Sequence, residues 1–301
     1  MQKRELEKLD LFQQYLRHER RLSLHTLDSY RRDLHSVVVF CDRQGIRCWS
    51  ELGSPQVRQF AAKIHSQGLA GRSIQRKLSA LRSFYRYLIR HGGLKNNPAQ
   101  DIRAPKTTRK LPHSLDVDRV QKLLDAPVHG WFAKRDLAMM ELLYSAGLRL
   151  AELVALNLDQ IDLQQGEARV LGKGRKTRIV PIGAKACAAL HDWLRARQVQ
   201  RVQDETALFI SRNGTRISAR SVQQRLKQWA LKQGLDSRLH PHALRHSCAS
   251  HVLESSGDLR AVQELLGHAN LSTTQVYTHL DFQRLAQVYD QAHPRARKAK
   301  K

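Results

Sequence analysis

The chain has 301 residues, enough for two domains with cores of their own, and its 52 Lys and Arg residues against 27 Asp and Glu residues give a net charge of +25. A positive charge of this size predicts a polyanionic partner. The sequence has neither an apolar run of membrane length nor a signal-peptide core, which predicts a cytoplasmic protein. The four cysteines have no metal-ligand or redox spacing and fit reduced thiols: Cys41, Cys48, Cys187 and Cys248.

The first part of the chain, residues 1–95, has the apolar periodicity of helices. Helical spacing is present in 6–16 and 27–40, Pro55 stands where a third helix would begin, and a fourth helix is predicted over 72–90. We therefore expect a helical N-terminal domain.

The two sides of the predicted helix over 72–90 differ sharply. One side is apolar and consists of Ile74, Leu78, Leu81, Tyr85 and Leu88. The opposite arc has five arginines and no acidic residue: Arg72, Arg76, Arg82, Arg86 and Arg90. Such an arc can contact a DNA backbone or groove, and the alternative is a solvated charged face.

Residues 96–115 have the composition of a linker, with three prolines and the basic run 106–110. The linker either lies along nucleic acid or is a solvated tether. Asp116 is the predicted N-cap of the next helix, and residues 116–301 form the predicted second domain.

The second domain is predicted to begin with helices over 120–124 and 132–143. Gly147 then interrupts the helical pattern, and Arg149 starts a new helix in which Glu152 lies one turn later. Two interpretations of this pair stay open. It is either an ordinary surface ion pair, or Glu152 holds the Arg149 guanidinium for a phosphate site.

Three short apolar runs, 160–163, 168–171 and 178–182, predict a small antiparallel sheet. Lys173 lies in a glycine-flanked turn between two of these strands. It can protonate a leaving alkoxide, or it is a solvated turn lysine. The Gly-x-x-x-x-Gly-Lys-Ser/Thr phosphate loop is absent, which argues against nucleotide binding.

The stretch 241–279 concentrates residues that carry chemistry. His242 and Arg245 share a face of the helix that Pro241 begins, beside a buried row formed by Leu244 and Cys248.

Further along this stretch, Asp258 is the predicted N-cap of a helix over 259–266. Gly267 ends that helix and presents His268, and Ser272 is expected to cap a short helix that carries Tyr277. A phenol needs neighbouring cations and a base to attack at neutral pH, and arginines also bind phosphate oxygens. The predicted target is therefore a phosphodiester.

The ordered series Arg149, Lys173, His242, Arg245, His268 and Tyr277 resembles the tyrosine recombinase/integrase family. Residues 266–268, Leu-Gly-His, followed by Tyr277-Thr278-His279, carry the most specific part of this resemblance, and residues 277–296 resemble the family's chromosome-dimer resolution branch. The resemblance implies a mainly α fold. Residues 1–95 would be a four-helix core-binding (SAM-like) domain, and residues 116–301 an α-helical catalytic domain with a small antiparallel sheet.

The resemblance also implies a strand transesterification that needs no metal, cofactor or ATP. Tyr277 would attack a DNA phosphate, form a 3′-phosphotyrosyl bond and release a 5′-hydroxyl. The phosphate would be held by Arg149, Arg245 and His268, with His242 accepting the tyrosine proton and Lys173 protonating the leaving oxygen.

The partners implied by the resemblance are double-stranded DNA with a dif-type site, a sister recombinase in a heterotetramer, and an FtsK-type DNA translocase. Phe282, Leu285 and Tyr289 form an apolar stripe that either docks on a neighbouring subunit or packs on its own domain. Residues 295–301 have the composition of a disordered basic tail.

Other functions compete with this one. One alternative is a metal-dependent hydrolase, since His242 and His246 have metal-ligand spacing and His240 and His251 are close in sequence. Against this alternative, Arg245 lies between the histidines, and 240–251 contains no carboxylate. Charge alone fits a DNA-binding protein without catalysis. Within the family, the chain could also be the sister recombinase or a mobile-element integrase.

Overall fold

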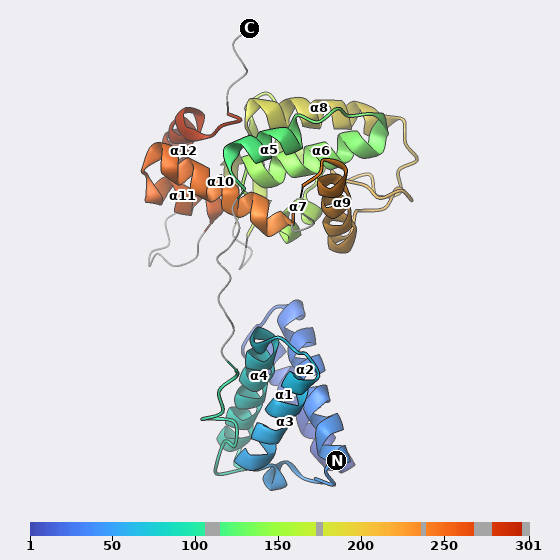
Figure 1. Ribbon diagram of the computed structural model, residues 1–301, viewed down its shortest axis with the longest axis vertical. Helices are drawn as coiled ribbons and strands as arrows, with labels where there is room; N and C mark the ends of the chain where they lie inside the picture. The colour runs from blue at the N-terminus through green and yellow to red at the C-terminus, as the bar shows by residue number, and fades with distance from the viewer. Residues whose placement is uncertain (106–114, 173–176, 236–238, 268–278, 297–301) are drawn as a thin grey trace. The chain divides into compact units, whose positions relative to one another are not determined.

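The computed structural model describes residues 1–105, 115–172, 177–235, 239–267 and 279–296. The chain divides into two compact units, Met1–Lys110 and Leu111–Lys301, which are drawn in Figure 1. Among the described residues, no helix is both long and apolar enough to cross a bilayer.

The described residues of the N-terminal unit, 1–105, form four α-helices and one short 3-10 helix. The α-helices are α1 (Lys3–His18), α2 (Leu24–Arg43), α3 (Ser54–Ser66) and α4 (Gly71–Arg90), and the 3-10 helix η1 covers Trp49–Glu51. They agree with the helices that apolar spacing predicts. All five residues of the predicted apolar side of α4 are buried in the core of this unit: Ile74, Leu78, Leu81, Tyr85 and Leu88.

The C-terminal unit is mainly helical with one small sheet. Its first elements are α5 (Val117–Leu124), α6 (Gly130–Ser145), α7 (Leu150–Ala155), η2 (Leu158–Gln160) and the strands β1 (Ile161–Asp162), β2 (Glu167–Leu171) and β3 (Thr177–Pro181). The elements that follow are α8 (Ala184–Gln198), α9 (Ala219–Lys232), α10 (Pro241–Ser256), α11 (Leu259–Leu266) and α12 (His279–Ala292). The strands form an antiparallel sheet in the order β1-β2-β3, which confirms the predicted fold class.

Helix α6 is buried along most of its length and packs against α8 and α10. Gly147, just beyond its end, has a φ of +56°, and a Cβ there would lie 3.1 Å from Leu266 Cδ2 and 3.4 Å from Cys248 Sγ. A left-handed backbone in so close a space requires glycine. The turn into α7 therefore lies directly against α10 and the end of α11.

The predicted ends of α11 are confirmed. The Asp258 side chain accepts a hydrogen bond from Ala261 N at 2.9 Å, and Gly267 ends the helix with a left-handed φ of +62°. The short helix expected from Ser272 to carry Tyr277 lies outside the described residues.

The C-terminal helix α12 packs on its own domain. Leu285 and Tyr289 are 5% and 1% exposed, and Tyr289 Oη lies 2.6 Å from Ser145 Oγ. For these two residues the structure supports the alternative of packing on the same domain, because both side chains are part of its buried core. The Phe282 side chain lies outside the described part of the chain.

The expectation that a disordered tail begins at Arg295 is wrong, because this residue is part of the folded domain. Its side chain is buried, and the guanidinium donates through Nε to Glu141 Oε2 at 3.0 Å and through Nη2 to Glu141 Oε1. It also donates to Asp125 Oδ1 at 3.1 Å. The sequence did not predict that Arg295 is buried in ion pairs, because its partners Glu141 and Asp125 are far away in the sequence.

Replacing Arg295 with methionine is expected to lower the free energy of unfolding by about 3 kcal/mol, because the buried Glu141 carboxylate would lose its counter-charge. Urea unfolding of the wild type and the variant measures this difference. Arg212→Met, at an exposed position, is the matched control and is expected to unfold like the wild type. Equal stability of all three proteins would contradict a structural role for Arg295.

Candidate functional site

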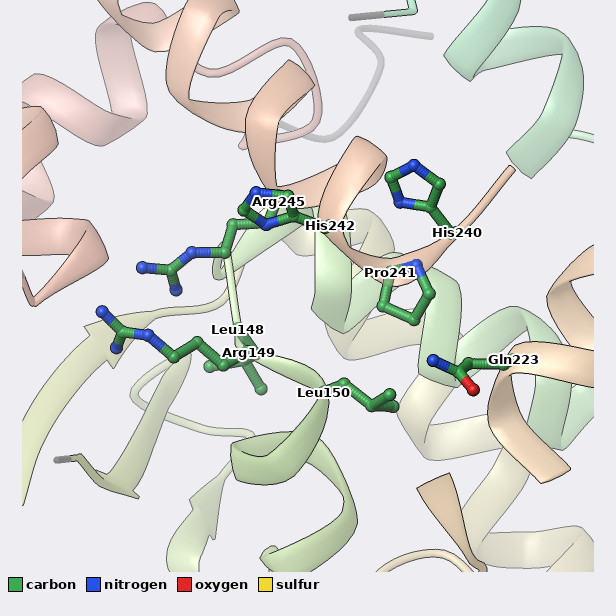
Figure 2. Close-up of a pocket in the computed structure, with 8 residues that line it drawn as sticks. All are labelled: Leu148, Arg149, Leu150, Gln223, His240, Pro241, His242 and Arg245. Atoms are coloured by element: carbon green, nitrogen blue, oxygen red, sulfur yellow. The ribbon is translucent and has the colours of Figure 1, made fainter. Parts of the chain in front are cut away.

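An open pocket of about 280 Å³ lies where α9, the start of α10 and the turn into α7 meet. Its lining contains three of the predicted site residues, Arg149, His242 and Arg245 (Figure 2). The remaining lining residues are Leu148, Leu150, Gln223, His240 and Pro241. Figure 2 shows the side chains of Arg149 and Arg245 extending in the same direction from α7 and α10.

Arg149 occupies the N-cap position of α7. Its backbone N–H donates to Glu152 Oε2 at 2.9 Å, and its Nη1 donates to Glu152 Oε1 at 2.9 Å. Its Nη2 donates to the carbonyl of Gly267 at 3.2 Å. A guanidinium has about five N–H donors, so these contacts fix Arg149 and leave donors for a ligand.

Arg245 comes from the first turns of α10 and is 6% exposed. It donates to the carbonyl of Gly147 and, at 2.6 Å, to the carbonyl of Leu266. Burial and the nearby charge of Arg149 lower the Arg245 pKa to about 10, so the group stays a cation at neutral pH. Two cations beside each other make the pocket attractive to an anion.

Glu152 is the carboxylate between these arginines, and it is 6% exposed. Its Oε1 and Oε2 accept hydrogen bonds from Arg178 Nη1 and Nη2 at 2.8 and 2.9 Å, and Arg245 Nη1 lies 3.9 Å away. Burial opposes the charged form, but hydrogen bonds from Arg178 and Arg149 bring the Glu152 pKa down to about 2. The interpretation of Arg149 and Glu152 as an ordinary surface ion pair is therefore wrong.

Arg178 was not among the predicted site residues. It lies on β3 and is 5% exposed. The available sequence signal was that Arg178 and the apolar Val180 are two residues apart, which places them on the same face of a strand. In the structure both residues are buried. Sequence spacing could not reveal its partner, because Glu152 precedes it by 26 positions.

His242 is an exposed residue that lines the pocket. Partial burial and the neighbouring His240, Arg245 and His246 lower its pKa below the usual value of 6.5. The imidazole is therefore neutral at pH 7 and can accept a proton. The predicted buried row beside it is confirmed, since Leu244 and Cys248 are fully buried.

Three predicted site residues lie outside the described part of the chain: Lys173, His268 and Tyr277. Their roles stay predictions. The described Gly267 directly precedes His268 in sequence, and its carbonyl already holds Arg149.

Two histidines of the metal-site alternative have other partners. His240 Nδ1 accepts the Ala243 N–H at 3.0 Å and so caps α10, while His251 Nδ1 lies 2.8 Å from Tyr144 Oη. Within the described ranges, no three His, Cys, Asp or Glu side chains are grouped to hold a metal ion.

The arginine face of α4 is partly engaged within the N-terminal unit. Arg76 pairs with the buried Asp33 at 3.0 Å, and Arg90 donates to Tyr15 Oη at 3.1 Å. Arg82 donates through Nε and Nη2 to the carbonyls of Ala99 and Ile102 at 2.9 and 2.8 Å.

Arg72 and Arg86 are exposed, so the proposal of DNA contact by this face is strongest for them. We expect Arg72→Ala and Arg86→Ala each to reduce the slope of log affinity against log salt by about one, because each removes one phosphate contact. Titrations with duplex DNA at several salt concentrations measure the slope. Arg58→Ala, an exposed change on α3, is the control. Unchanged slopes in both α4 variants would indicate a solvated face.

A further polar face adjoins the pocket and was not predicted. Four exposed residues of α9 are spaced to lie on one side of the helix: Arg220, Gln223, Gln224 and Lys227. Gln223 also lines the pocket (Figure 2). Arginine, lysine and glutamine side chains can hydrogen-bond the edges of bases.

Comparisons with known proteins find similarity over most of the chain. Residues 113–284 match the model of the Phage integrase family, and residues 9–92 match that of the phage integrase N-terminal SAM-like domain. A tyrosine recombinase XerC of Azotobacter vinelandii is 56% identical over 293 residues, which cover 97% of each chain. A tyrosine recombinase XerC of Alcanivorax borkumensis is 56% identical over 298 residues, covering 98% of this chain and 96% of the relative.

Solved structures share the fold. XerH site-specific recombinase bound to palindromic difH substrate, in a post-cleavage complex, has a TM-score of 0.69 and 21% identity, covering 94% of this chain and 83% of that chain. The Tn1549 transposon integrase in complex with transposon right end DNA has a TM-score of 0.71 and 18% identity, covering 92% and 97%.

Proposed function

Because this chain belongs to the phage integrase family, in which its curated relatives are tyrosine recombinases, we propose that its pocket binds the scissile phosphate of a DNA strand. The chain is a site-specific recombinase that acts on DNA. The proposal extends this to the reacting groups: Tyr277 is the nucleophile, and the bond that it forms is a 3′-phosphotyrosyl ester.

One observation carries the proposal. Arg149 and Arg245 both line an open pocket, and each is fixed by two hydrogen bonds from its guanidinium to protein acceptors. Their remaining donors can bind the non-bridging oxygens of a phosphodiester and stabilise the charge that develops there. Because Glu152 and backbone carbonyls hold the two groups beforehand, little reorganisation is needed during the reaction.

In the proposed reaction, Tyr277 Oη attacks phosphorus, the bond to the 5′ oxygen breaks, and the phosphate becomes esterified to the tyrosine. The phenol proton goes to the neutral imidazole of His242, in keeping with its lowered pKa, and Lys173 gives a proton to the departing 5′ oxygen. His268 donates a hydrogen bond to the phosphate. The energy of the broken ester is retained in the new one, so a 5′-hydroxyl of another strand can rejoin it without ATP.

The biological role that we propose is resolution of chromosome dimers at a dif-type site during cell division. The full-length match to proteins named XerC supports this role. The chain would act in the cytoplasm in a heterotetramer with a sister recombinase, XerD, and with an FtsK-type DNA translocase. The alternatives are an XerD-like role or that of a mobile-element integrase.

The exposed face of α9 is expected to contribute to recognition of the site. Gln224→Ala should weaken binding to a dif-type duplex by about 1–3 kcal/mol more than binding to an unrelated duplex, because a glutamine can pair with the edge of one base. Competition binding with the two duplexes measures this difference. Gln198→Ala, on the exposed side of α8, is the control. Equal weakening on both duplexes would indicate backbone contact.

The test of the proposed function is covalent capture. Wild type and Tyr277→Phe are incubated in EDTA with a duplex that carries a dif-type site and a nick beside the scissile phosphate, with and without the partner recombinase. Denaturing electrophoresis should reveal a protein–DNA adduct for the wild type alone. Cleavage that disappears in EDTA would favour a metal-dependent hydrolase. DNA binding without an adduct under either condition would favour a non-catalytic DNA-binding protein.

A further inference from the structure

Arg178 is a buried cation that the proposed reaction does not use. It projects from β3, its side chain is 5% exposed, and both of its terminal nitrogens bind Glu152. A buried guanidinium is unfavourable unless its partner is well placed. Its position therefore needs a reason beyond the packing of the sheet.

The contacts of Glu152 supply that reason. A carboxylate has about four lone-pair positions. Arg178 donates to both oxygens, and the backbone and side chain of Arg149 provide one hydrogen bond to each. The orientation of Glu152 that holds Arg149 is thus also fixed from the other side by β3.

Arg178 also contacts Gly267, the second residue that accepts a hydrogen bond from the Arg149 side chain. A Cβ at Gly267 would lie 3.0 Å from Arg178 Nε and 3.1 Å from Arg178 Cδ, so the side chain lies directly against the end of α11. The carbonyl of Gly267 accepts the hydrogen bond from Arg149 Nη2 at 3.2 Å. Arg178 therefore contacts both groups, one carboxylate and one backbone turn, that hold the Arg149 guanidinium.

We infer that Arg178 is a positioning residue for strand cleavage, which sets the orientation of Arg149 through Glu152 and the turn at Gly267. This inference rests on the proposed function. Lysine is a poor substitute, because a single ammonium cannot form the paired hydrogen bonds of a planar guanidinium. A neutral residue at this position would also leave Glu152 facing fewer cations.

The change in charge has a measurable consequence for pH dependence. Glu152 faces Arg149 from the turn into α7, Arg178 from β3 and Arg245 from α10. In the wild type the carboxylate stays ionised throughout the working range, since its pKa is about 2. Without Arg178, burial raises the pKa of Glu152, and the proton bound as the pH falls would release Arg149.

The experiment measures the single-turnover rate of adduct formation on the nicked duplex between about pH 5.5 and pH 8.5. Arg178→Lys is expected to be slower by about tenfold at the alkaline end with unchanged DNA affinity. Arg178→Gln should show an additional loss of rate on the acid side. That additional loss should be absent when Glu152→Gln is added to Arg178→Gln, because the titrating group is gone.

Arg169→Gln, an exposed change on the neighbouring strand β2, is the matched control and should keep the wild-type profile. Circular dichroism at each pH identifies any variant that does not fold. If Arg178→Gln does not fold, the rate of Arg178→Lys tests the inference. Wild-type rates for both Arg178 variants, or an acid loss that persists in the double variant, would overturn the inference. An absence of adduct in the wild type would instead contradict the proposed function.

Discussion

Replacing Arg245 with lysine is expected to slow DNA strand cleavage by about 10²–10³-fold while duplex binding changes little. Arg245 is 6% exposed, and backbone carbonyls of Gly147 and Leu266 hold its two terminal nitrogens. Lysine keeps the charge but has neither the length nor the planar fork to satisfy both carbonyls and a phosphate. The loss should therefore appear in the chemical step.

The measurement is the single-turnover rate of adduct formation, accompanied by a binding titration on the same duplex. Arg260→Lys is the matched control, because Arg260 is an exposed arginine on α11 that pairs with Glu264. Its rate should equal that of the wild type. A wild-type rate for Arg245→Lys would mean that no bidentate contact to phosphate forms at this position.

Replacing Glu152 with alanine is expected to lower the free energy of unfolding by about 3–5 kcal/mol and also to slow cleavage. Both effects have one cause. The variant leaves Arg178 buried without its counter-charge and removes the acceptor that orients Arg149. Urea unfolding and adduct formation are measured on the same preparation, with Glu254→Ala, an exposed change on α10, as the control.

The stabilising effect of Glu152 has a defined pH dependence. Its pKa is about 2 in the folded chain against an ordinary value of 4.5, so its contribution is fully present above pH 4.5 and is lost as the pH falls toward 2. The stability difference between the wild type and Glu152→Gln should shrink over that window. A difference that does not vary with pH would contradict a lowered pKa of Glu152.

Features governed by neighbouring residues could be predicted from the sequence. The N-cap at Asp258, the helix stop at Gly267 and the break at Gly147 each depend on local backbone chemistry, and all three are present. The apolar side of α4 was predictable for the same reason, since helical periodicity alone determines which residues can share one face.

Features that depend on distant partners could not be predicted. From the sequence, Arg178 is a charged residue on a predicted strand and Arg295 is a charged residue of a predicted basic tail. In the structure both are buried against carboxylates from other elements. Helical periodicity places Arg82 on the arginine face that was predicted to contact DNA. In the structure its guanidinium donates hydrogen bonds to the backbone carbonyls of Ala99 and Ile102. In each case the sequence reveals the charge, and only tertiary packing reveals its partner.

We propose that Tyr277 becomes covalently joined to the 3′ phosphate of a DNA strand held by Arg149 and Arg245. The most direct test of this proposal is to isolate the adduct formed on a nicked duplex, digest the protein, and identify the modified peptide and the attached DNA end by mass spectrometry. We expect a peptide that contains Tyr277 linked to a 3′ phosphate, with a free 5′-hydroxyl on the other product. Attachment at another residue, or to a 5′ phosphate, would contradict it.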